Sequence, residues 1–128
     1  MTDHPNVQIV RDALDSMTET DVAALAAVVA DNIEYHQIGA PAIMGKAALV
    51  ESMEGFGEME FGLEVHDVLA NDDHTIALLD VTVKAGDQEF KYRTAEIYHI
   101  EDGKITKRWA FSDDTQAITD FFAKLAAG

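Results

Sequence analysis

Apolar residues recur along the chain at two spacings, and each spacing predicts a different kind of element. Near the start, Val7, Val10, Leu14 and Met17 lie three or four residues apart, which is the spacing of one helix face. Between residues 61 and 69, apolar and polar residues alternate instead, which is the period of a strand with one buried face. The chain therefore combines amphipathic helices with half-buried strands.

The order of these elements predicts the fold class. The pattern predicts helices at 7–16, 22–29, 46–53 and from the cap at 113 or 114 through 125, and strands at 33–38, 61–69, 75–84, 88–100 and 104–111. The residues suited to cap or end these helices are Asn6, Thr20 or Asp21, Asp31 with Asn32, and Asp113 or Asp114. Four long antiparallel strands with helices gathered on one side define an α+β domain. A curved sheet wrapped around helices leaves a cone-shaped cavity in which small ligands bind.

Composition limits what this domain can be. At 128 residues with 48% apolar content, the chain has the size of one ordinary domain, and we expect a single domain over residues 1–128. It has no apolar run long enough to cross a membrane, and its first residues are acidic and polar, unlike a signal peptide. We therefore expect a cytoplasmic protein. Without cysteine, the chain can form neither a disulfide nor a thiolate nucleophile.

The net charge of the chain limits the kinds of partner that we expect it to bind. The formal charge of −15, from 24 acidic against 9 basic residues, repels phosphate backbones, so we expect no nucleic-acid partner and no membrane partner. The same field is nearly indifferent to neutral molecules, so the charge favours a neutral or cationic ligand. Of these we expect a small, neutral, largely apolar compound. The histidines lack the paired spacing of zinc sites and the glycines lack a nucleotide-binding pattern, so we expect no metal and no cofactor.

A later strand places a carboxylate among aromatic side chains. Counting in twos, Tyr92, Glu96 and Tyr98 share one face of this strand. If that face is buried, the carboxyl group must be paired, protonated or catalytic. Two interpretations are open: an apolar pocket raises the pKa of Glu96 and makes it an acid, or an ion pair with Arg93 or Arg108 lowers that pKa and makes the residue structural.

The turn at residues 101–103, Glu-Asp-Gly, decides which side chains face Glu96. A three-residue loop with its glycine at positive φ pairs Ile100 with Lys104 and Glu96 with Arg108. A two-residue loop turns Arg108 away from Glu96 instead. The first register gives Glu96 these neighbours on its own face: Tyr98, Arg108, Ala110 and Ser112.

Three short motifs carry a resemblance to a known family. They are Ala-Asp-Asn at 30–32, Gly-Lys-Ala at 45–47, and Glu-Asp-Gly-Lys-Ile at 101–105 before Trp109. With the order of elements, they resemble the SnoaL-like branch of the NTF2-like superfamily over nearly the whole chain. That superfamily includes ketosteroid isomerases, polyketide cyclases, epoxide hydrolases and binding domains, so the resemblance implies an NTF2-like cone-shaped fold more than one reaction. It also favours the first hairpin register.

The resemblance also assigns positions to catalytic roles. In the ketosteroid isomerases, a carboxylate at the end of the first strand shuttles a proton and an acid on a late strand stabilises an oxyanion; these positions fall on His36 and Glu96. The isomerase tyrosine falls on Ala13 and the cyclase acid on Ala110. The arginine flanked by carboxylates in the epoxide hydrolases is missing, since Thr94 stands two residues before Glu96.

Together, the residues and the resemblance predict a small-molecule pocket protein. The resemblance implies His36 and Glu96 as catalytic residues for proton transfer of an isomerase, cyclase or lyase type. The predicted substrate-binding residues are Tyr35, Tyr92, Tyr98, Arg108, Ala110 and Ser112. Two alternatives remain open: His36 lines the pocket without chemistry, and the whole protein is a non-catalytic binding or accessory protein.

The opposite face of the hairpin predicts a subunit contact. Trp109, Phe111 and Ile105 fall on this face with Ala95 and Ile97, so it also needs a cover. Many members of the resembled family dimerise through this side, and a homodimer is the expectation. The alternative is that the final helix covers part of the face.

Overall fold

The computed structural model describes residues 4–19, 21–54 and 59–127. Within these ranges the chain forms four helices and six strands, which confirms the predicted α+β class. The helices are α1 (Pro5–Thr18), α2 (Val22–Val28), α3 (Lys46–Glu54) and α4 (Thr115–Ala127). The strands are β1 (Val29–Tyr35), β2 (Ile43–Met44), β3 (Glu60–Ala70), β4 (Thr75–Ala85), β5 (Gln88–Glu101) and β6 (Lys104–Ser112). No helix in the described ranges is long and apolar enough to cross a membrane.

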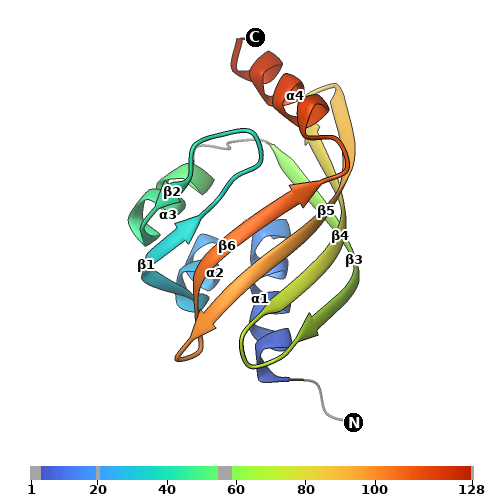
Figure 1. Cartoon of the computed structure of the whole chain (residues 1–128). Helices are drawn as coiled ribbons and strands as arrows, with labels where there is room; N and C mark the ends of the chain where they lie inside the picture. Colours follow the sequence, from blue (N-terminus) through green and yellow to red (C-terminus); the bar gives the residue numbers. More distant parts are fainter. Residues whose placement is uncertain (1–3, 20, 55–58, 128) are drawn as a thin grey trace.

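One curved, open sheet organises the molecule. Its strand order is β2-β1-β6-β5-β4-β3, and β1 runs parallel to β6 while the other neighbours are antiparallel. Helix α1 packs against β3 and β4, and α2 and α3 lie beside β1 (Figure 1). Helix α4 follows β6 and stands at the end of the sheet, near the connection between β4 and β5 (Figure 1). The helices therefore leave the far face of the sheet open.

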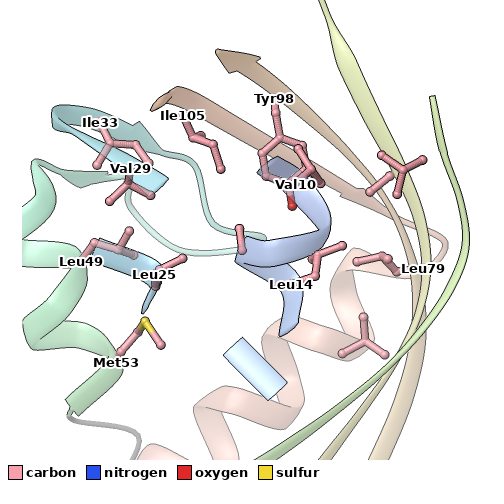
Figure 2. Packing of buried hydrophobic residues seen from close by; sticks show 14 of the residues in the cluster. Val10, Leu14, Leu25, Val29, Ile33, Leu49, Met53, Leu79, Tyr98 and Ile105 are labelled. Atoms are coloured by element: carbon pink, nitrogen blue, oxygen red, sulfur yellow. The ribbon is translucent and has the colours of Figure 1, made fainter. Parts of the chain in front are cut away.

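The core lies between the concave face of the sheet and the helices. Val10 and Leu14 of α1 point toward Leu79 of β4 and Tyr98 of β5 (Figure 2). A second part of the core joins α2 and α3 to β1, and its buried members are Leu25, Val29, Ile33, Leu49 and Met53. The inward positions of β4 and β5 are those that the two-residue alternation predicts, since Leu79, Glu96 and Tyr98 are all buried.

Two element boundaries near the N-terminus differ from the prediction. Helix α1 begins before Asn6, because the Nδ1 atom of His4 accepts a hydrogen bond from the backbone N–H of Asn6 at 3.2 Å and caps the helix. Strand β1 begins at Val29 rather than Ile33 and includes the Asp31-Asn32 pair. An irregularity in its pairing with β6 accommodates these residues. The predicted caps Asp21 and Asp114 are confirmed.

The hairpin register differs from the three-residue prediction, although its consequence for Arg108 holds. Asp102 and Gly103 both have positive φ, 51° and 75°, and form a two-residue turn that pairs Glu101 with Lys104. A bulge at Thr106 then inserts one residue into β6. Because this residue shifts the parity by one, Arg108 still faces inward.

Because of this bulge, two positions differ from the prediction. Tyr98, and not Glu96, pairs with Arg108, while Glu96 pairs with Ala110. Ile105 lies in the core at 2% exposure rather than on the outer face beside Trp109. The extra residue of the bulge therefore lets Ile105 point inward while Trp109, four residues later, points outward.

Candidate functional site

A mostly apolar pocket lies between the concave face of the sheet and the elements that cover it. It is a cavity of about 410 Å³, within the usual size range of small-molecule sites. Most of its wall is apolar, with Leu14, Met17, Ile38, Phe61, Leu63, Leu79, Val81, Ile118 and Phe122 among the lining residues. The polar lining residues are Tyr35, Gln37, Tyr92, Glu96, Arg108 and Thr119. The cavity is therefore an apolar chamber with a polar end formed by Tyr35, Tyr92, Glu96 and Arg108.

Glu96 is the acidic residue of this polar end, and four donor contacts hold its carboxylate. The Tyr98 hydroxyl donates to Oε1 at 2.5 Å and the Thr94 hydroxyl donates to Oε2 at 3.2 Å. Arg108 approaches both oxygens, with Nη2 3.0 Å from Oε2 and Nε 3.4 Å from Oε1. A carboxylate can accept hydrogen bonds along about four lone-pair directions, so donors within the protein already satisfy the Glu96 carboxylate.

Arg108 links this carboxylate to β1. Its Nη1 donates to the backbone carbonyl of His36 at 3.0 Å, and its guanidinium carbon lies 4.3 Å from the centre of the Tyr35 ring. Arg108 and Glu96 are 8% and 5% exposed, so water screens their attraction weakly. Burial by itself lowers the pKa of Arg108, but the Glu96 charge, Tyr35, Tyr98 and the hydrogen bond to Glu96 together raise it more, and the net pKa lies above its ordinary value. The pair is therefore a fixed, charge-neutral unit.

All three tyrosines of the chain surround this pair and stay protonated. Burial, followed by the repulsion of the Glu96 charge, raises the pKa of Tyr92 to about 12 and that of Tyr98 well above its ordinary value. Burial also raises the pKa of Tyr35, whose hydroxyl makes only a weak contact with the Met17 sulfur at 3.9 Å. Tyr92 has no hydrogen-bond partner among the described residues, so its hydroxyl is a donor still free for a ligand.

The structure brings together four of the predicted binding and catalytic residues and places three near them. Tyr35, Tyr92, Glu96 and Arg108 line one cavity. The three others lie outside the lining. Tyr98 donates to Glu96, Ala110 pairs with Glu96, and Ser112 pairs with Thr94, whose hydroxyl also donates to Glu96.

His36 is not brought together with Glu96. Its ring stacks on Trp109 with centres 5.4 Å apart and planes 8° apart, and Trp109 pairs with the outward residue Ile97. The ring therefore lies on the opposite face of the sheet from the cavity. The physical reason is the alternation of β1: Tyr35 points inward beside Arg108, so the next side chain points outward. This placement removes the expected His36–Glu96 pair from the candidate site.

Several lining residues were not predicted from the sequence. Gln37 to Ala40 follow β1 and form one wall, and Ile118 and Phe122 of α4 form another. The spacing of Ile118 and Phe122, four residues apart on a predicted helix, was an available signal for an inward face. No such signal placed the segment after β1. In the part of the chain that the structure describes, no group of three or more histidine or acidic side chains is arranged to hold a metal ion.

Comparisons with known proteins agree with this architecture. No curated protein sequence matches the chain. An NTF2-like protein from Burkholderia xenovorans LB400 is 25% identical, with a TM-score of 0.80 over 94% of this chain and 97% of that one. An LEH-like epoxide hydrolase from M. tuberculosis is 19% identical, with a TM-score of 0.79 over 95% and 90% of the two chains. A putative polyketide cyclase from Xanthomonas campestris pv. campestris is 17% identical, with a TM-score of 0.73 over 88% and 93%.

These structural similarities show the fold, which is that of NTF2-like proteins. The family comes from the sequence itself, because the SnoaL-like domain family matches residues 10–108. This match covers most of the chain and includes α2, α3 and the strands that carry Glu96 and Arg108. The chain therefore belongs to the SnoaL-like domain family.

Proposed function

We propose that this protein binds a small, neutral, largely apolar molecule, with an acceptor oxygen of that molecule against the Tyr92 hydroxyl. The observation that carries the proposal is the closed Glu96–Arg108 pair at the polar end of an apolar chamber, beside a tyrosine hydroxyl that lacks a partner among the described residues. The apolar wall supplies most of the binding free energy, at about 25 cal/mol per Å² of apolar surface removed from water. The polar end sets the orientation of the ligand.

The charge state of the polar end supports a neutral ligand. Glu96 already accepts from Tyr98, Thr94 and Arg108, so a ligand donor would have to displace one of them. A ligand carboxylate would bring an uncompensated charge into an apolar site, since the positive charge of Arg108 is already balanced. A carbonyl or ether oxygen needs only a donor, and the Tyr92 hydroxyl supplies one.

A matched ligand series tests this proposal. The probes are 2-acetylnaphthalene, 2-ethylnaphthalene, which lacks the oxygen, and 2-naphthoate, which carries a charge. Isothermal titration should show the ketone binding about 2- to 12-fold more tightly than the ethyl compound, the gain of one hydrogen bond of about 0.5–1.5 kcal/mol. The naphthoate should bind most weakly.

The matched variants are Tyr92→Phe and Tyr35→Phe. The first should remove the preference for the ketone, and the second should keep it, because the Tyr35 hydroxyl is directed at Met17. Absence of binding by both the ketone and the ethyl compound would contradict the proposal.

Proton transfer of an isomerase, cyclase or lyase type is the second candidate function. The observation that favours it is that Glu96 is the one acidic residue among those that line the cavity in the described part of the chain. For Glu96 to act as a base, one of its donors must first move away. Glu96→Gln should then remove turnover of a bound substrate, while His36→Ala, which alters the outer face, should retain it. Equal turnover in both variants would exclude Glu96 from the chemistry.

We also propose that two copies of the chain associate through the outer face of the sheet. Leu69, Leu78 and Phe111 are 53%, 38% and 58% exposed on this face, beside the half-buried Trp109. Light scattering on the wild type should give the mass of a dimer, and Phe111→Glu should give that of a monomer. A monomeric wild type at high protein concentration would contradict this.

A further inference from the structure

Two small voids lie behind the main cavity, on the side of the helices. Each has a volume of about 20 Å³. One is bounded largely by aliphatic side chains of α1, α2, β1 and β6, and the other by residues of α2, β2 and α3. Figure 2 shows the side chains of Leu25, Leu49 and Met53, which bound the second void, between these helices. Voids this apolar hold ordered water poorly and can instead admit a methyl or methylene group.

Two residues line the main cavity and both voids: Met17 at the end of α1 and Tyr35 at the end of β1. They form the shared part of the partition between the chamber and the space behind it, which Leu14 and Arg108 complete toward the first void and Gln37 toward the second. The contact between them is the weak one of the Tyr35 hydroxyl with the Met17 sulfur, at 3.9 Å. Displacing the Met17 side chain would therefore break a weak contact with Tyr35 and would join the main cavity to the two voids.

The two shared members of the partition differ in how firmly they are held. The Arg108 guanidinium lies 4.3 Å from the centre of the Tyr35 ring, and the ion pair with Glu96 fixes Arg108 in turn. Met17 is only half-buried, and its unbranched side chain has three rotatable bonds and adapts to irregular space. Tyr35 is thus the rigid member of the partition and Met17 the movable one.

We propose that Met17 is a specificity-determining residue that sets the length of the apolar ligand. This inference rests on the proposed function. A short ligand fills the main cavity with Met17 in its present place. A longer apolar chain turns the Met17 side chain aside and enters the space beside Leu25 and Leu49. The site therefore accepts a series of related compounds up to a limit that Met17 imposes.

Alkyl phenones with increasing chain length provide the probe, because all of them carry the same carbonyl group. Isothermal titration of the wild type should show affinity rising by up to about fourfold for each added methylene, followed by a plateau or decline. In Met17→Ala, the optimum should move to chains longer by about three methylenes, the size of the atoms removed. Met17→Leu keeps a similar volume with a stiffer side chain, so its affinity for short phenones should be unchanged and that for the longest should fall.

Met53→Ala is the matched control. It makes the same chemical change, but Met53 lines only the second void and not the partition. Its optimum chain length should equal that of the wild type. An optimum that stays unchanged in Met17→Ala, or moves equally in both alanine variants, would overturn the inference.

A second measurement covers the case in which Met17→Ala fails to fold. In the wild type labelled with ¹³C at the methionine methyl groups, the Met17 resonance should move with a long phenone and stay nearly fixed with acetophenone. Equal shifts for both ligands would overturn the inference. If the wild type binds no phenone and no alkylnaphthalene, it is the proposed function that fails. If phenones bind with a preference that depends on Tyr92 while the optimum ignores Met17, only this inference fails.

Discussion

The two faces of the sheet each carry an arginine–carboxylate pair, in very different surroundings. On the inner face, Arg108 and Glu96 approach to 3.0 Å and are almost completely buried. On the outer face, Arg93 and Asp80 approach to 3.1 Å, but the side chain of Arg93 is 76% exposed. The shortest distances are nearly the same, although Arg108 contacts both oxygens of Glu96 and Arg93 contacts one oxygen of Asp80. Water screens the outer pair much more than the inner one. Burial, rather than distance, therefore decides how much stability is lost when one partner is removed.

The largest effect is expected from removing the inner arginine. Arg108→Met leaves the Glu96 carboxylate buried without a counter-charge, and such a loss costs about 3–5 kcal/mol. Urea denaturation at neutral pH should show this decrease in the free energy of unfolding. Arg93→Met on the outer face is the matched control, and its free energy of unfolding should change by less than about 1 kcal/mol.

A double variant shows whether the cost comes from the unpaired charge. In Glu96→Gln combined with Arg108→Met, no charge remains buried, so part of the stability lost in Arg108→Met should return. The double variant should therefore unfold at a higher urea concentration than Arg108→Met alone. If it is less stable than the single variant, lost packing by the arginine side chain outweighs the electrostatic cost.

Alkaline pH should destabilise the protein through the tyrosines of the inner face. The pKa of Tyr92 is raised to about 12 and those of Tyr35 and Tyr98 are also raised, so the folded state favours the neutral phenols. This stabilisation is complete below pH 10, the ordinary tyrosine value, and is lost as the pH rises through the higher folded values. Stability should fall by up to about 1.4 kcal/mol per pH unit for each tyrosine.

Ultraviolet absorbance measures tyrosine ionisation directly. Because all three tyrosines of the chain lie on the inner face, the native protein should show almost no tyrosinate at pH 10, whereas the urea-unfolded protein should be about half ionised. A native protein that titrates near pH 10 would contradict the burial of these hydroxyls.

A smaller effect is expected from one hydroxyl within the inner network. Tyr98→Phe removes a hydrogen bond of 2.5 Å to the buried Glu96 carboxylate, and hydrogen bonds to charged groups contribute about 1.5–3 kcal/mol. Tyr35→Phe makes the same chemical change where the hydroxyl meets only the Met17 sulfur, so its cost should be near zero. Urea denaturation of both variants checks the difference, and equal costs would show that the Glu96 contact has no special weight.

The inner face could be predicted from the sequence more fully than the residues around it. The alternation of β4 and β5 predicts that Leu79, Glu96 and Tyr98 face inward, because a strand repeats every two residues. The bulge at Thr106 could not be predicted in this way, since one extra residue reverses the parity of β6 and brings Ile105 into the core. The catalytic role expected of His36 came from the resemblance, which does not determine the face of the sheet on which its side chain lies.

The position of His36 follows from the local pattern once the face of Tyr35 is known. Because Tyr35 points inward beside Arg108, the next side chain, that of His36, points outward. The walls formed by residues 37–40 and by α4 depend on how distant elements meet, which a local pattern does not contain.

The outer pair should respond least, and its response should depend on pH. The hydrogen bond from His66 lowers the pKa of Asp80, slight burial opposes this, and the charges of His66 and Arg93 lower it further. A carboxylate with a lowered pKa stabilises the folded state above its ordinary value of 3.8, and this contribution is lost as the pH falls through the lower folded value. Asp80→Asn should therefore differ from the wild type slightly at neutral pH and not at all in strong acid.

Salt separates this response from that of the inner face. Screening by concentrated salt should abolish the small difference between Asp80→Asn and the wild type at neutral pH, because its partners His66 and Arg93 are exposed. The same salt should leave most of the deficit of Arg108→Met, whose unpaired carboxylate is shielded from solvent ions by the protein. Urea midpoints of both variants at low and high salt provide the measurement. Equal salt sensitivity in the two variants would mean that the inner pair is open to water, and the contrast between the two faces would then be lost.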